Sequence, residues 1–192
     1  MRRLWSEDRV SVEGKWHSYE DAFIEPKPMQ DPCPIWIASN PSPATDREHV
    51  WERALHRVGR MADGWMTVQM FPEMFKTNWT KIQAFLAEEG RDDASFPNMA
   101  YHNILIGPDR DTCLEESKRF LDDYYGPVFS AEMVANWTAA GTPDEVVAHL
   151  RALVADGAKS ITLRVTGWDQ RGQYQRMTEE VLPRVREAVA AG

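Results

Sequence analysis

The stretch PCPIWIASNPSPATDREHVWERALHRVGRMADGW, residues 32–65, decides the fold of this chain of 192 residues. It begins with a short apolar run at 35–38, which is typical of a buried strand. A loop of small polar residues follows, and then a segment with apolar side chains at helical spacing. Gly64 opens a second short apolar run. The stretch therefore predicts a strand, a helix and a second strand, which is the repeating unit of an α/β fold.

The same alternation continues to the end of the chain. The predicted strands are 35–38, 64–68, 99–106 and 160–165. The predicted helices are 46–61, 72–89, 109–125, a short one within 130–138, the segment between Thr142 and Gly157, and 173–190. Pro183 is expected to bend the last of these helices. Thr142 and Glu145 have the spacing of a capping box. Strands separated by helices predict a mainly parallel sheet with right-handed crossovers.

The first 34 residues have a different pattern. Residues 10–24 alternate apolar and polar around Gly14, which predicts a hairpin-like excursion, and the proline-rich run 26–34 predicts an extended lead-in. We expect one domain over 1–192, with four βα units in 35–192.

Composition excludes several classes of protein. The net charge of −8 argues against a nucleic-acid surface, and no apolar run is long enough for a membrane span. The first residues lack the apolar core of a signal peptide. Cys33 and Cys113 lie far apart and are typical of buried thiols in a reducing compartment. We therefore expect a cytoplasmic protein.

Several short segments, in this order, resemble one known family. They are Leu4-Trp5, VSVEG at 10–14, PKPMQ at 26–30, PCPIWIA at 32–38, ADGW at 62–65, GTPDEV at 141–146 and VLP at 181–183. This series is similar to the second half of the luciferase-like flavin or deazaflavin oxidoreductases. The resemblance implies a TIM barrel that carries FMN or a deazaflavin (coenzyme F420).

The length sets a limit on that resemblance. A complete (β/α)₈ barrel takes about 250 residues, and the resemblance covers roughly its last four strands. We expect the N-terminal half of the barrel to be missing. The alternative is a non-catalytic half-barrel module that needs a second copy or another chain. The unpaired strand edges near 35–38 and 160–165 favour a homo-oligomer in either case.

Candidate site residues follow from the rule that barrel enzymes carry their functional groups at the carboxyl ends of strands. The rule selects Ala38, Ser39, Asn40 and Pro41 after the first strand and Thr67, Val68 and Gln69 after the second, with Gly107, Thr166 and Gly167 after the later ones. The resemblance implies that the loop 38–41 contacts the cofactor, often its phosphate-bearing side chain, and makes Thr67 the better candidate of the second group. Many members have consecutive glycines or serines where this chain has Ser39-Asn40. The other interpretation is that the loop only turns and caps the next helix. Trp65 is expected in the core.

The catalytic residues stay unknown at this point. His102 is expected near the start of its strand, facing the bottom of a barrel, and His17 is the best candidate among five histidines. Metal-ligand spacings such as HExxH, nucleophile elbows and Walker-type loops are absent, so no metal is expected. The resemblance implies that the cofactor carries the chemistry, as monooxygenation with a flavin or as hydride transfer with a deazaflavin, on a small organic substrate. It also implies a reductase that supplies the reduced cofactor as a partner.

Overall fold

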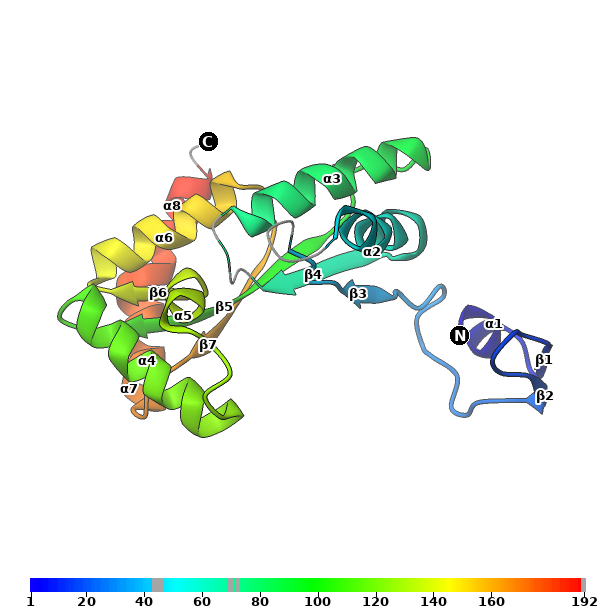
Figure 1. Ribbon diagram of the computed structural model, residues 1–192, viewed down its shortest axis with the longest axis horizontal. Coiled ribbons are helices and arrows are strands. Elements are labelled where there is room, and N and C mark those ends of the chain that lie inside the picture. Colours follow the sequence, from blue (N-terminus) through cyan, green and yellow to red (C-terminus); the bar gives the residue numbers. More distant parts are fainter. Residues whose placement is uncertain (43–46, 69–70, 72, 191–192) are drawn as a thin grey trace. The chain divides into compact units, whose positions relative to one another are not determined.

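The computed structural model describes the whole chain except residues 43–46, 69–70, 72 and 191–192 (Figure 1). The described chain separates into two compact units, Met1–Trp36 and Ile37–Gly192. None of its helices has the length and apolar character that crossing a bilayer requires.

The first unit holds a helix and a hairpin. Helix α1 covers Arg2–Ser6, and strands β1 (Val10–Val12) and β2 (Tyr19–Ala22) pair antiparallel. The predicted hairpin is thereby confirmed, whereas α1 was not predicted because its five residues are too few to show a periodic apolar face. Lys27 closes the end of this helix, since its Nζ donates to the carbonyl oxygens of Leu4 at 3.0 Å and Glu7 at 2.7 Å.

The second unit is an α/β sheet with helices between its strands. In chain order its elements are β3 (Trp36–Ala38), α2 (Glu48–Met61), β4 (Gly64–Val68), α3 (Met74–Glu88), β5 (Asn98–Ile106), α4 (Arg110–Tyr125), α5 (Ala131–Asn136), β6 (Thr138–Gly141), α6 (Pro143–Ala155), β7 (Ile161–Val165), α7 (Gln170–Arg176), a π-helical turn (Met177–Val181) and α8 (Leu182–Ala190). The strand order is β3-β4-β5-β6, and β7 pairs with β5.

Strand β5 is the centre of this sheet (Figure 1). Its residues 98–101 pair parallel with β4, residues 103–106 with β6, and residues 100–104 with β7. Because residues 100 and 101 pair with both β4 and β7, those two strands lie on opposite sides of β5. The four predicted strands and their parallel arrangement are confirmed.

Two local predictions were wrong. The expected count of four strands and four βα units misses β6, because Ala139, Ala140 and Gly141 belong to residue types that are rare in strands and the segment follows the short helix α5 directly. The last helical segment begins at Gln170 rather than at 173. Pro183 is accommodated by the π-helical turn that precedes it, so the chain stays helical from α7 into α8.

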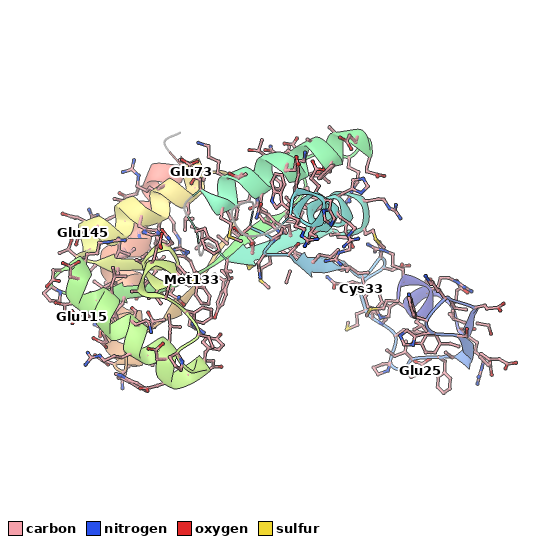
Figure 2. The ribbon with its side chains drawn as sticks, in the orientation of Figure 1. Glu25, Cys33, Glu73, Glu115, Met133 and Glu145 are labelled. Carbon is pink, nitrogen blue, oxygen red and sulfur yellow. The ribbon has the colours of Figure 1, made fainter. Side chains whose placement is uncertain are left out.

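The start of α6 follows the sequence prediction closely. The Thr142 side chain accepts from the backbone N–H of Glu145, and the Glu145 carboxylate accepts from the backbone N–H of Thr142 at 2.8 Å. This capping box satisfies two donors that every helix start leaves free. Figure 2 shows Glu145 at this end of α6. Gly157 follows the helix with φ of +100°, a conformation that favours glycine.

The main core lies between the sheet and its helices. Trp65 is fully buried, and its ring lies 5.1 Å from that of Phe75 and 6.2 Å from that of Trp79, measured between centroids. Alternate residues of β5, Ala100 and Ile104 among them, point into the same cluster. The expectation that Trp65 is a core residue is confirmed.

The intervening residues of β5 point to the other face of the sheet. Near the carboxyl end this face is covered by α4, where Leu105 packs with Cys113 and Ala140. Both cysteines are free; Cys113 is buried as predicted, but Cys33 is only half-buried. Burial raises the pKa of the Cys113 thiol.

Candidate functional site

The loop that follows β3 is fixed to the carboxyl end of β4. The backbone N–H of Ser39 donates to the carbonyl oxygen of Met66 at 3.1 Å, and the indole Nε1 of Trp65 donates to the carbonyl oxygen of Ser39 at 3.0 Å. The backbone N–H of Val68 donates to Oδ1 of Asn40 at 3.2 Å. Three hydrogen bonds thus hold residues 39 and 40 at the edge where barrel enzymes bind ligands.

A second clamp holds the next residue of the loop. Asn78 of α3 is fully buried, and its Nδ2 donates to the carbonyl oxygen of Pro41 at 2.8 Å. The indole Nε1 of Trp51 in turn donates to Oδ1 of Asn78 at 2.7 Å. The N-cap of α2 is Arg47, which makes no side-chain cap, so this helix does not begin on Ser39 or Asn40. The loop is therefore held by its neighbours and does not serve as a cap.

Burial divides the five predicted cofactor contacts. Ala38 and Asn40 are exposed, whereas Ser39 and Pro41 are buried. Thr67 is 1% exposed and pairs with Ala100, on the side of the sheet that faces the main core and the helices α2, α3 and α6, the helix-facing side, whereas α4 lies on the opposite face. Its hydroxyl donates to the carbonyl oxygen of Val68 at 3.3 Å. Direct side-chain contact with a ligand is thus open to Ala38 and Asn40. Gln69 lies outside the described residues.

The later strand ends lie against α4. The Thr166 hydroxyl is fully buried and lies 2.8 Å from the hydroxyl of Ser117. A side chain at Gly167 would meet Leu105 and Glu116, and one at Gly107 would meet Cys113. These glycines allow the chain to pass close to α4. Close packing against α4 is therefore enough to explain why both positions are glycine, and no ligand contact is needed.

The histidines do not form a conventional acid–base group. His17 is exposed on the hairpin and stacks on Tyr19. The expectation for His102 was wrong, because it lies in the middle of β5 and faces α6, where its Nε2 is 2.9 Å from Nε2 of His149. Burial lowers the pKa of His102 well below its usual value and that of His149 to about 4. No three potential metal ligands gather anywhere in the described chain.

Arg164 forms a polar cluster that the sequence did not reveal. The guanidinium carbon of this β7 residue lies 5.2–5.7 Å from the ring centroids of Tyr101, Tyr124, Tyr125 and Trp137. Its Nε donates to Oδ1 of Asn103 at 3.1 Å and its Nη1 to the hydroxyl of Tyr125 at 2.9 Å. A charged residue inside the apolar strand ITLRV was the available signal, since arginine is rarely buried without a partner. The aromatic partners are scattered along the sequence and could not be inferred from it.

Comparison with known proteins identifies the family. Residues 1–130 match the model of the luciferase-like monooxygenase family, and the chain belongs to that family. This confirms the resemblance that the sequence motifs indicated.

The curated relatives are dehydrogenases. The chain is 25% identical over 211 residues to an F420-dependent glucose-6-phosphate dehydrogenase of Microbacterium testaceum, with 99% of this chain and 59% of the relative covered. It is 27% identical to a protein of the same name from Mycobacterium avium, with 97% and 58% covered. The chain therefore spans less than two thirds of the length of these relatives.

The solved structures agree on the fold. An F420-dependent secondary alcohol dehydrogenase in complex with an F420–acetone adduct matches with a TM-score of 0.77 at 18% identity, over 96% of this chain and 58% of the other. The monooxygenase RslO1 from Streptomyces bottropensis matches with a TM-score of 0.70 at 19% identity, over 95% and 57%. The α/β architecture is that of a partial TIM barrel, as the sequence predicted.

Proposed function

We propose that this chain is the cofactor-binding part of a luciferase-like oxidoreductase that uses F420 or FMN and acts on a small organic substrate. The observation that carries the proposal is the family match through the loop 38–41 together with the rigid attachment of that loop to β4. The named relatives use F420, and both F420 enzymes and monooxygenases occur among the structural neighbours.

The loop residues fit a phosphate-bearing cofactor. Ala38 is exposed and has only a methyl side chain to limit close approach, and the exposed Asn40 uses its side-chain carbonyl oxygen in a hydrogen bond to Val68. The amide group of Asn40 is a hydrogen-bond donor suited to an anionic oxygen. The role of the chain is then to bind and orient the cofactor with groups that hydrogen bonds already hold in place, which lowers the entropy cost of binding.

The chemistry comes from the cofactor. A reduced flavin or deazaflavin supplies the electrons for oxygenation or for hydride transfer, and the protein supplies position and environment. This division of labour accounts for the lack of an acid–base constellation in the described residues. It also makes the cofactor, rather than a side chain, the first thing to test.

The test is a fluorescence titration of the full chain with FMN, reduced FMN and F420 in parallel. We expect saturable binding of one cofactor, and a loss of about tenfold in affinity in the variant Asn40→Ala, since it removes the exposed amide donor of the loop. Ser160→Ala is the matched control, because Ser160 is exposed and lies at the amino end of β7. Binding of neither cofactor would reject the proposal for this chain alone.

A second function is favoured by the strand edges. In the described chain β3 and β7 each pair with one strand only, so each leaves an edge for a further strand. We therefore also propose a half-barrel module that completes its sheet with another chain or copy. Light scattering tests this idea, and a monomer that unfolds cooperatively at all concentrations would reject it.

A further inference from the structure

Three polar residues form one row across the sheet. In the strand register Asn103 of β5 pairs with Thr138 of β6 on one side and with Arg164 of β7 on the other. Residues that pair directly in a parallel sheet point to the same face. Asn103 and Thr138 are fully buried. The row lies on the face that also carries Tyr101, opposite the main core.

Each member of the row has a buried polar atom without a partner. Among the residues that the structure describes, Nδ2 of Asn103, Oγ1 of Thr138 and Nη2 of Arg164 make no hydrogen bond, and the other two buried polar atoms of this kind, Nδ1 of His102 and Oδ1 of Asp122, lie outside the row. Native proteins leave few buried polar groups unpaired, because each costs about 1–3 kcal/mol. Three such atoms in adjacent positions of one row therefore point to a common partner outside the protein.

The charge of the row is also uncompensated. Arg164 makes no ion pair with any carboxylate of the described chain, and its contacts are aromatic rings and neutral oxygens. A guanidinium keeps its charge in every protein environment, so it cannot become neutral on burial. Tyr124 and Tyr125 are the last two residues of α4 and are 69% and 43% exposed. Their rings lie between the Arg164 guanidinium and solvent. The hydroxyl of Tyr125 accepts a hydrogen bond from Nη1 of Arg164, so it takes the position in which a ligand oxygen would accept that bond.

We propose that Arg164, Asn103 and Thr138 bind the carboxylate of an organic substrate, with the aromatic rings around Arg164 packing against the substrate's body. Two N–H donors and one hydroxyl match the two oxygens of a planar carboxylate. One guanidinium balances one negative charge, whereas a phosphate dianion would need a second cation. The interpretation of the row as a substrate site rests on the proposed function. The charge and the donors of the row indicate the substrate class, an organic carboxylate.

The experiment is calorimetric titration of the full chain with benzoate, benzyl alcohol and phenyl phosphate, without any cofactor. We expect benzoate to bind at least about tenfold more tightly than benzyl alcohol, because only benzoate can pair with Arg164. Equal affinity for the two would overturn the proposal. Tighter binding of phenyl phosphate than of benzoate would overturn the carboxylate class and assign the row to a phosphate group. Because this titration contains no cofactor, a failure of benzoate binding can be distinguished from a failure of cofactor binding.

Three variants sharpen the test. Arg164→Met should abolish the preference for benzoate, and Tyr125→Phe should strengthen benzoate binding about two- to fivefold, because it frees Nη1 and keeps the ring. Asn103→Asp places a carboxylate of the chain itself beside Arg164, so it should raise the melting temperature and remove benzoate binding. This last variant stays informative if Arg164→Met does not fold. Unchanged benzoate affinity in a folded Asn103→Asp variant would contradict the proposal.

Discussion

Neighbouring residues of β5 meet two different environments. His102 points to the helices and contacts His149, whereas Asn103 points to the other face and contacts Arg164. Both β5 residues are fully buried. The helix-facing side tolerates its polar pair because an imidazole can lose its proton, as the lowered pKa of both histidines shows. The opposite face holds a cation that cannot do so, and it surrounds that cation with aromatic rings.

The difference teaches that burial alone does not mark a site. A buried group that becomes neutral is compatible with a structural role in the core. A permanent cation that is half-buried and has a buried nitrogen without a partner, Nη2 of Arg164, calls for an acceptor that the described chain does not supply. The four predictions below test this contrast between the helix-facing side and the opposite face, from the largest effect to the smallest.

The largest effect is expected from Trp65→Ala on the helix-facing side. The indole is fully buried between Phe75 and Trp79 and donates to Ser39, so its loss leaves a cavity and an unpaired carbonyl oxygen. We expect the free energy of unfolding to fall by about 3–5 kcal/mol. Denaturant unfolding measures it. Met66→Ala, the next residue and half-buried on the other face, is the control and should cost clearly less.

The second prediction concerns the histidine pair. In the folded chain the pKa of His149 is about 4 and that of His102 is also lowered, whereas an unfolded histidine titrates near 6.5. Between these values the unfolded state binds more protons, so stability is complete above about pH 6.5 and falls as the pH drops towards 4. The expected loss from His149 is roughly 2 kcal/mol by pH 4.5.

The measurement is a series of urea unfolding curves from pH 7.5 to 4.5. His149→Gln keeps a hydrogen-bonding side chain beside His102 and removes one titrating group, so its stability should depend less on pH than that of the parent. An identical pH dependence in the two proteins would show that the pair does not carry the acid sensitivity.

The third prediction tests the helix that carries His149. Thr142→Ala removes the capping-box hydroxyl at the start of α6 and should lower stability by about 1 kcal/mol. Thr162→Ala is the matched control, because Thr162 is exposed on β7 and caps no helix. Thermal unfolding compares the two, and equal losses would mean that the cap is not needed.

The smallest effect is expected from Thr162→Lys on the opposite face. The side chain is exposed and β7 has one strand partner, so the isolated chain should change by no more than about 0.5 kcal/mol. Unfolding at two protein concentrations measures it. A larger loss that grows with protein concentration would instead reveal that another copy covers this face.

Much of the fold could be predicted from local patterns. The apolar runs located all four main strands, and the capping box marked the start of α6 correctly, because these signals involve residues that are close in sequence. The strand β6 could not be predicted, since its four small residues form a strand only by pairing with β5. Helix α1 could not be predicted either, because it is too short to show a periodic pattern of apolar residues.

The candidate site was predictable only in part. The sequence located the loop 38–41, but burial of Ser39 and Pro41 and the orientation of Thr67 towards the helices came from the structure. Arg164 was visible as a charge within an apolar strand, but its partners were not. Tyr101, Tyr125 and Trp137 come from a strand, the end of a helix and the residue after another helix.

By itself, the sequence determined the alternation of strands and helices, the family and the end of the sheet where a cofactor is expected. Hydrophobic period, caps and turn residues act over a few positions, so they can be read along the chain. Only the tertiary structure decided which polar groups share a face, because strand register brings Thr138, Asn103 and Arg164 together over more than 60 residues. Pairing of distant strands sets that register, and no local pattern contains it.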